Sequence, residues 1–272
     1  MSVPSGSWAG GRFGERARCV LAPNADVMTL DGTNTWVLRE PGARRSVVVD
    51  PGPAIDAHLD AIVEAADGEV GVVLLTHHHH DHAEAARAFA ERMGCGVRAL
   101  DPALTLGGEG LRDGDVVELD GLEVRVVATP GHTADSLSFW VPADGAVLTG
   151  DTVLGRGTTV VAHPDGQLGA YLDSLDRLHA LASEHELAAI WPGHGPVIPD
   201  ALGVLDHYRA HRRDRLGQVE AALASLASST PEGLAADDLP RRVVEIVYAD
   251  VDPVLWGAAE LSVRAQLAYL GR

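Results

Sequence analysis

Short apolar runs alternate with longer, helically periodic segments along the first 200 residues, and this alternation constrains the fold more than any other feature. Each run ends at a polar or glycine- and proline-rich turn, which is typical of buried strands. The predicted strands are Ser46–Asp50, Val70–Thr76, Leu122–Thr129, Leu137–Val141, Ala146–Thr149 and Ala188–Trp191. Strands mixed with helices predict a layered α/β fold.

Helices are expected at Ala83–Met93 and Gln167–Leu181, because apolar side chains recur there at steps of three and four residues. Prolines and Asp200, a candidate helix N-cap, end this region. We therefore expect one domain over residues 1–200 and a small helical domain over 201–272. In the second domain a long helical segment precedes a turn at Ser228–Gly233 and two further helical stretches that end at Leu270.

The charge balance limits the partners of the chain. Its net charge is −18, which disfavours RNA and anionic membranes because phosphates are repelled at long range. Two cysteines, Cys19 and Cys95, are too few for a disulfide framework. Met1 to Arg12 show no secretory signal, and no apolar run could span a bilayer. We expect a cytoplasmic protein that acts on a small molecule without a membrane partner; its oligomeric state stays open.

The segment Leu74–His82 reads Leu-Leu-Thr-His-His-His-His-Asp-His and joins a predicted strand to a helix. In an extended loop His77 and His79 point the same way and could share one metal ion. Asp81 and His82 stand at the helix start, turned toward a second position. Imidazole and carboxylate donors together suit Zn²⁺, and also Mn²⁺ or Fe²⁺. Since His78 and His80 have the same spacing, the residues alone leave two registers open.

Three further loops that follow apolar runs carry a potential metal ligand beside a glycine. They are Thr129–Thr133 with His132, Thr149–Thr152 with Asp151, and Trp191–Pro196 with His194. Glycine permits a close approach of the backbone at such a position. Together with the histidine-rich segment, these donors suffice for two ions that each keep an open position.

These motifs, in this order, resemble the metallo-β-lactamase superfamily, whose pattern H-x-H-x-D-H selects His77, His79, Asp81 and His82. Within it, four stretches are similar to the lactamase-beta-like protein 2 group, which is related to glyoxalase II. These stretches are Thr33–Trp36, Thr149–Val160, Tyr171–Leu175 and Pro192–Ile198.

The resemblance implies a four-layer αββα sandwich with a winged-helix-like C-terminal domain. It implies one ion on His77, His79 and His132, with Asp151 as a bridge between the two ions. It implies a second ion on Asp81, His82 and His194, while Asp50 and Thr76 support the ligands from behind. Asp81 and Asp151 are then the catalytic carboxylates.

The expected function is that of a hydrolase in which two Zn²⁺ ions share an activated hydroxide. An ester, a thioester or a related acyl compound is the first candidate substrate. The group also contains endoribonucleases, so cleavage of single-stranded RNA is the alternative. A basic stretch, Arg209–Arg215, would guide phosphates in that case. A solvated helix face is the simpler interpretation of this stretch, and an arginine clamp for an anionic substrate is the alternative.

A few residues are weaker candidates for substrate binding. Asn34, Thr158 and Thr159 lie in stretches similar to the group and could border the cleft. His163 could serve as a general acid, because its ordinary pKa suits proton transfer at neutral pH.

Overall fold

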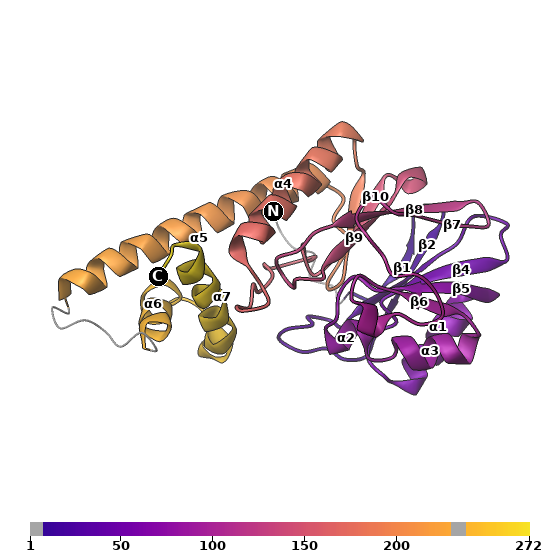
Figure 1. Cartoon of the computed structure of the whole chain (residues 1–272), viewed down its shortest axis with the longest axis horizontal. Coiled ribbons are helices and arrows are strands. Elements are labelled where there is room, and N and C mark those ends of the chain that lie inside the picture. Colours follow the sequence, from indigo (N-terminus) through magenta and orange to yellow (C-terminus); the bar gives the residue numbers. More distant parts are fainter. Residues whose placement is uncertain (1–7, 230–237) are drawn as a thin grey trace.

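Two mixed β-sheets lie face to face, and helices cover their outer faces (Figure 1). The computed structural model describes residues 8–229 and 238–272. The first sheet has the strand order β1-β2-β3-β4-β5-β6, and the second has the order β11-β10-β9-β8-β7. Helix, sheet, sheet and helix form four layers, so the predicted αββα sandwich is confirmed.

The strands of the first sheet are antiparallel from β1 to β4 and parallel from β4 to β6. They are β1 (Gly11–Phe13), β2 (Ala17–Leu21), β3 (Asn34–Leu38), β4 (Arg45–Val49), β5 (Glu69–Leu74) and β6 (Gly96–Arg98). In the second sheet only β10 and β11 are parallel. Its strands are β7 (Val116–Leu119), β8 (Leu122–Ala128), β9 (Leu137–Val141), β10 (Ala146–Gly150) and β11 (Ala189–Pro192).

The central strands are nearly continuous apolar runs, because one face of each sheet packs on helices and the other face packs on the second sheet. Every residue of β3, β9 and β10 is buried. Between the sheets Trp36 of β3 stacks on Trp191 of β11, with ring centroids 5.2 Å apart and an interplanar angle of 13°. This contact fixes the two sheets against each other close to the ends of β3 and β11. All six predicted strands are present, each within two residues of its expected ends.

Helices α1 (Asp56–Ala66) and α3 (Ala86–Met93) pack on the outer face of the first sheet. Helix α4 (Leu168–Glu184) packs on the second sheet and matches the predicted helix at Gln167–Leu181. The predicted helix Ala83–Met93 corresponds to α3, which begins three residues later than expected, because Ala83 ends the short α2 (His80–Ala83). Helix α1 and five strands, β1, β2, β3, β6 and β7, have no counterpart in the sequence prediction.

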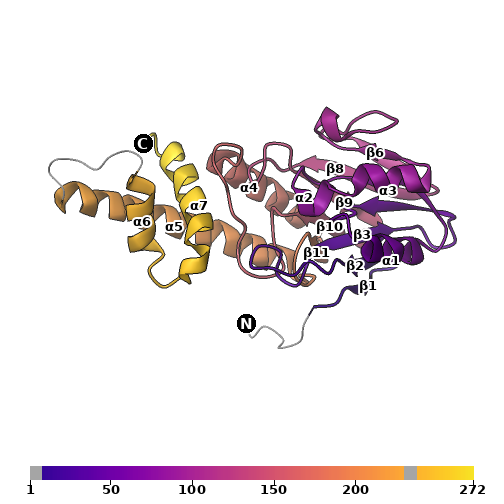
Figure 2. The same cartoon turned by 90° about the horizontal axis from the view of Figure 1, so that it is seen from below.

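Helix α5 (Ala201–Ser229) leads away from the sandwich toward α6 (Leu239–Val247) and α7 (Trp256–Tyr269), as Figure 2 shows from below. Asp200 caps it as predicted, because its Oδ1 accepts a hydrogen bond from the Gly203 N–H at 2.9 Å. The first half of α5 packs Leu205 and Tyr208 into the cluster under α4. Its second half packs Val219 and Leu226 against α6 and α7. One continuous helix thus joins two hydrophobic clusters.

The predicted division at residue 200 stays a prediction, because α5 belongs to both clusters. Of the predicted turn at Ser228–Gly233, the first two residues are the end of α5, and residues 230–233 lie outside the described residues. The described part of 201–272 contains helices and no strand, so the likeness to a winged helix also stays a prediction. In the described part of the chain no helix is long and apolar enough to cross a membrane.

Candidate metal centre

The loops after five strands meet at one edge of the sandwich. Asp50 follows β4, the histidine-rich segment follows β5, and Asp151 follows β10. His132 and His194 follow β8 and β11. Parallel pairing of β4 with β5 and of β10 with β11 places their carboxyl ends side by side, so the polar side chains converge there.

Seven side chains form three overlapping groups, and within each group the potential ligand atoms lie within 4.8 Å of one another. The groups are His77 with His79 and His132, His77 with His82 and Asp151, and Asp81 with His82 and His194. All seven predicted ligands are therefore brought together. His78 and His80 are exposed and lie outside these groups, so the geometry distinguishes the two registers.

Ring nitrogens face one another across the cluster at short distances. His79 Nδ1 lies 3.1 Å from His77 Nε2 and 3.0 Å from His132 Nε2. On the other side His194 Nε2 lies 3.2 Å from His82 Nε2 and 3.1 Å from Asp81 Oδ2. Asp151 reaches both halves, with 3.3 Å from Oδ2 to His194 Nε2 and 3.8 Å to His132 Nε2.

The opposite ring nitrogens of the buried histidines are held by the protein. His132 Nδ1 donates to the Val160 carbonyl at 2.7 Å, and His194 Nδ1 donates to the Gly32 carbonyl at 3.2 Å. His82 Nδ1 donates to Asp50 Oδ2 at 2.9 Å. Such hydrogen bonds fix the tautomer and leave the inward nitrogen with its lone pair free for a metal.

Asp50 and Thr76 contact two of the seven side chains from behind the cluster, where the resemblance places supporting residues. Both are buried, and the Asp50 carboxylate accepts hydrogen bonds from the Thr76 backbone N–H at 2.8 Å and from Thr76 Oγ1 at 2.6 Å. Thr76 Oγ1 in turn accepts from His77 Nδ1 at 2.9 Å. Asp50 has a positive φ of 51°, a conformation that few residues other than glycine, Asn and Asp adopt. One carboxylate therefore orients a ligand of each half of the cluster.

Burial and the neighbouring charges move the pKa values of the cluster in two directions. Burial, together with the neighbouring imidazoles, lowers the pKa of His79 to about 4, and the pKa values of His77 and His132 are lowered too. Burial also opposes the charge of His194, but the Asp151 carboxylate outweighs it and raises the pKa of His194 to about 9. At neutral pH three imidazoles are therefore neutral, which is the form that binds a metal ion.

The backbone leaves room for this cluster at Gly193. A Cβ at this position would lie 2.5 Å from Asp151 Oδ1 and 2.8 Å from His82 Cε1. The same Asp151 Oδ1 is buried without a hydrogen bond among the described residues, and His82 Nε2 lies 3.4 Å from it. An unpaired buried carboxylate oxygen is costly unless a cation binds it. The donor set, the missing partner and the close backbone all fit metal ions at this place.

A cavity of about 330 Å³ opens beside the cluster, and His132 and Asp151 line it. Apolar residues of the loops after β2 and β10 and of the segment from α6 to α7 form much of its wall, namely Val27, Met28, Leu30, Leu154, Val160, Val251, Leu255, Ala258 and Ala259. Val27 and Met28 are 55% and 47% exposed although they are apolar. An exposed apolar wall beside buried polar groups is typical of a binding site for a small organic molecule.

The four weaker candidates for substrate binding differ in their positions. Thr158 and Thr159 line the cavity. Asn34 is buried and donates from Nδ2 to the Pro192 and Gly195 carbonyls at 2.9 and 2.8 Å, so it fixes the loop that carries His194. His163 is exposed, and neither it nor Asn34 is among the residues that line the cavity.

The cavity also has a cationic side, which the sequence suggests only as the alternative interpretation of the basic stretch. Arg212 and Arg215 of α5 line it together with His211 and Arg156. These arginines belong to the basic stretch that the simpler interpretation assigns to a solvated face, and Arg209 fits that interpretation. Their spacing of three residues places both on one side of a helix, which was the available signal. Arg212 is in fact only 5% exposed.

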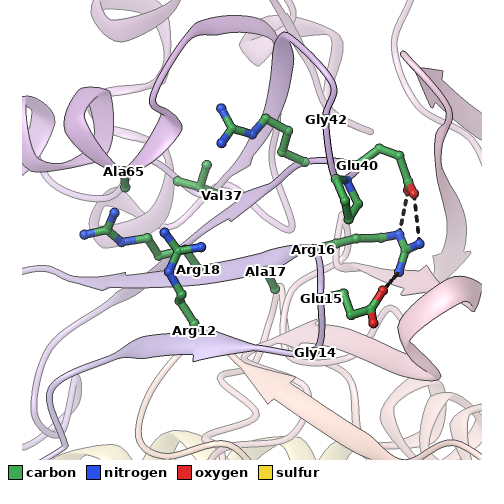
Figure 3. A pocket seen from close by; sticks show the side chains of 12 residues that line it. Arg12, Gly14, Glu15, Arg16, Ala17, Arg18, Val37, Glu40, Gly42 and Ala65 are labelled. Atoms are coloured by element: carbon green, nitrogen blue, oxygen red, sulfur yellow. Dashed lines mark hydrogen bonds and ion pairs between the residues drawn. The ribbon is translucent and has the colours of Figure 1, made fainter.

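A second hollow, of about 260 Å³, lies at the opposite end of the first sheet, where β2 begins and β3 ends. Figure 3 shows the Arg12 and Arg18 side chains, which rise from neighbouring strands toward the same space. Arg16 binds Glu40 there through Nε at 2.6 Å and Nη2 at 2.9 Å. Its Nη1 lies 3.5 Å from Asp144 Oδ1. We call the region around Arg16, Glu40 and Asp144 the far end of the sandwich.

Comparison with known families identifies one match, and it covers most of the first domain. The family described as the Metallo-beta-lactamase superfamily matches residues 28–194, which span every residue of the cluster. Solved structures are also similar. A metallo-beta-lactamase family protein from Thermus thermophilus has a TM-score of 0.73 at 22% identity, over 94% of this chain and 93% of its own. A beta-lactamase domain protein from Burkholderia ambifaria has a TM-score of 0.77 at 22% identity, over 99% and 89%.

Curated relatives share more of the sequence. A Drosophila melanogaster protein named "Beta-lactamase-like protein 2 homolog" is 30% identical over 92% of this chain and 86% of its own length. "Lactamase-like protein aptB" of Emericella nidulans is 35% identical over 77% and 66%. "Atrochrysone carboxyl ACP thioesterase" of Aspergillus chevalieri is 31% identical over 78% and 67%. A further solved structure, 24% identical over 69% of this chain and 97% of its own with a TM-score of 0.54, is described as a di-iron-bound form. These matches confirm the resemblance that the motifs indicate.

Proposed function

Because the chain belongs to the metallo-beta-lactamase superfamily, we propose that it is a dinuclear zinc hydrolase acting on a small ester, thioester or related acyl compound. The observation that carries this proposal is the convergence of five imidazoles and two carboxylates on one space beside a cavity. A metal-dependent hydrolase is the activity that this family and the named thioesterase relative share.

The ligands divide into two sets that share Asp151. His77, His79 and His132 would hold one ion, and Asp81, His82 and His194 would hold the other. Asp151 lies between the sets, since its two oxygens approach His82 and His194 on one side and His132 on the other. Two Zn²⁺ ions bound there supply Lewis acidity and a nucleophilic water at neutral pH.

Asp81 and Asp151 have separate tasks in this proposal. Burial opposes the ionisation of Asp81, but the neighbouring imidazoles outweigh it and lower its pKa to about 2, so Asp81 is ionised at neutral pH. Its side chain is 28% exposed, more than that of any other member of the second set. It can therefore accept a hydrogen bond from the attacking water and orient it. Asp151 is 11% exposed and keeps the two sets of ligands in place.

The cavity favours an acyl substrate over RNA. Its wall is rich in apolar side chains and holds a small organic group. The relative named a thioesterase acts on an acyl compound by its name, which supports the same class here. The net charge of −18 repels a long polyanion, whereas a small molecule is little affected.

One observation supports the alternative of RNA cleavage, namely the presence of Arg212 and Arg215 at the cavity. Arg209, in the same stretch, instead binds Asp176 and Asp206 away from the cavity. The basic stretch is therefore not a continuous track for phosphates.

A panel of thioesters, lactones, phosphodiesters and single-stranded RNA, each with and without a chelator, tests the proposal. We expect chelator-sensitive hydrolysis of acyl substrates that is lost in His132→Ala. Chelator-sensitive cleavage of RNA alone, also lost in His132→Ala, would establish the alternative; a contaminating nuclease would survive the substitution. Elemental analysis of protein purified without added metal distinguishes zinc from iron, which the di-iron-bound neighbour makes a necessary measurement.

A further inference from the structure

Arg212 is a buried cation that has no acidic partner among the residues that the structure describes. Its side chain lies on the cavity wall and only 5% of the residue is exposed. Nη2 donates to the Thr159 carbonyl at 2.6 Å, and the guanidinium lies 4.7 Å from the centre of the Tyr171 ring. Nε is buried without a hydrogen-bond partner. A buried guanidinium normally pairs with an anion, because neutral groups offset its desolvation only in part.

Arg215, three residues further along α5, is half-buried and has similar neighbours. Its Nη1 donates to the Val247 carbonyl at 2.6 Å and to Gln218 Oε1 at 3.0 Å, and its guanidinium lies 4.3 Å from the centre of the Tyr248 ring. It also lines the cavity, and within residues 8–229 and 238–272 no carboxylate forms an ion pair with it. Two guanidiniums on one helix face, each held by an aromatic ring and a carbonyl, form a rigid pair of donors.

The same helix shows what an arginine with a structural or solvated role looks like. Arg209 binds Asp176 at 2.6 Å and Asp206 at 3.4 Å on the outer side of the helix. Arg156, which lines the cavity, is neutralised by Asp31. Although the chain has 39 acidic residues, neither of the two arginines of α5 that line the cavity forms an ion pair with a carboxylate among the described residues.

We infer that Arg212 and Arg215 bind an oxyanion group of the substrate, so that the molecule hydrolysed is an acyl compound that also carries a carboxylate or phosphate. The inference rests on the proposed hydrolase function. A guanidinium presents two parallel N–H donors that match the two oxygens of such a group. The apolar wall formed by Val251, Leu255 and Ala259 then contacts the carbon chain between the anion and the scissile bond.

Matched substrates test this inference. We would compare the phenyl thioester of glutaric acid with the corresponding thioester whose free carboxylate is replaced by a primary amide, which has the same shape but no charge. Wild-type kcat/KM is expected to be about tenfold higher for the anionic thioester, the value of one charge-assisted hydrogen bond. In Arg212→Gln the ratio is expected to fall to about one. A third thioester, with a phosphonate in place of the carboxylate, shows by its kcat/KM whether the wild type prefers a carboxylate or a phosphate-like group.

Arg209→Gln is the matched control, since it removes the same charge from the same helix outside the cavity, and it should keep the ratio. A merely structural Arg212 would lower kcat/KM for both thioesters by one factor and leave the ratio unchanged, which would overturn the inference. Equal rates on both thioesters in the wild type would do the same. Where Arg212→Gln does not fold, Arg215→Gln provides the second variant, and a ratio equal to that of the wild type would contradict the paired site.

Calorimetric binding separates this inference from the hydrolase proposal. Glutarate carries two carboxylates, and its monoamide carries one. A metal could bind one carboxylate of either compound, so only glutarate offers a further carboxylate to Arg212 and Arg215. Tighter binding of glutarate that is lost in Arg212→Gln supports the oxyanion site even if neither thioester is hydrolysed. Equal binding of both compounds to the wild type contradicts the site whether or not the chain is a hydrolase.

Discussion

The two ends of the sandwich hold charged side chains in opposite ways. At the metal end Asp151, which is 11% exposed, lies among imidazoles of both kinds: burial lowers the pKa values of His77 and His132, whereas the Asp151 carboxylate outweighs burial and raises that of His194. At the far end Arg16, 14% exposed, binds Glu40 through two N–H groups and lies 3.5 Å from Asp144 Oδ1, while Asp144 Oδ2 is buried without a hydrogen bond. Opposite charges paired in this way stabilise the fold without a ligand. Seven donors of metal-ligand type that crowd into one buried space indicate instead that a ligand completes them.

The largest effect that tests this contrast is expected from Asp151→Ala. The substitution removes the carboxylate that reaches both sets of imidazoles. Groups that only orient a metal ligand already contribute 10–100-fold, so we expect turnover to fall by more than about 100-fold. Elemental analysis should show a loss of bound metal in the same sample. Full metal content together with wild-type turnover would exclude the bridging role.

Asp50→Asn should have the next largest effect. Asparagine tolerates the positive φ at this position and still accepts from the Thr76 N–H. Its NH₂ group, however, cannot accept the hydrogen bond from His82 Nδ1 that Asp50 Oδ2 accepts now. We expect metal affinity to fall about 10–100-fold, measured by titration with a competing chelator.

Asp144→Asn is the control for this measurement, because Asp144 is an aspartate of comparable burial at the far end, with a side chain that is 3% exposed. Its metal affinity should equal that of the wild type. A similar loss of affinity in both variants would mean that general destabilisation, and not the support of His82, explains the result.

Arg16→Met tests the far end and should affect stability alone. Removal of the guanidinium leaves the buried Asp144 without its cation and Glu40 without its hydrogen bonds. We expect Tm to fall by about 4 °C, with unchanged metal content and turnover. Arg12→Gln, on the neighbouring strand, is the matched control and should leave Tm nearly unchanged, because Arg12 has no ion pair within the described residues. A large loss of activity in Arg16→Met would show that the two ends are not independent.

The sequence predicts the metal end far better than the far end, for a physical reason. Metal ligands must be particular residue types in loops that follow strands, so His132 and Asp151 can be recognised by type and place, and the family pattern selects His77 and His79 from the run of four histidines. The ion pair of Arg16 and Glu40 joins residues of common types 24 positions apart, and nothing local indicates it. Likewise β1, β2 and β7 alternate polar with apolar residues or are short, and their pairing depends on distant partners.

The cavity wall shows the same limit. Arg212 and the solvated Arg209 are three residues apart in one basic stretch, and only the packing of α5 against Thr159 and Tyr171 separates their environments. Helix periodicity indicates that residues share a face but does not identify which face meets a cavity. Asn34 shows the opposite case. It lies in a stretch similar to the lactamase-beta-like protein 2 group and was a candidate for substrate binding, but it fixes a loop instead of lining the cavity.

The smallest expected effect concerns His58 of α1, a buried histidine next to the metal end that no carboxylate pairs with in the described part of the chain. Burial lowers the pKa of His58 to about 4, whereas His194, beside Asp151, has a pKa raised to about 9. Because the folded state disfavours the charged form of His58, its contribution to stability is complete above about pH 6.5. It should be lost as the pH falls from 6.5 toward 4.

Denaturant unfolding of the wild type and of His58→Gln at several pH values between 7 and 4 measures this contribution. Other groups titrate in both proteins, so the difference between the two curves isolates His58. The wild type should lose more stability than the variant over this range, because only the wild type must keep a buried imidazole uncharged. Parallel curves would mean that the His58 imidazole takes up a proton in the folded state as readily as in the unfolded state. The protonated His58 would then be a buried cation next to Thr35, whose Oγ1 lies 2.9 Å from His58 Nε2.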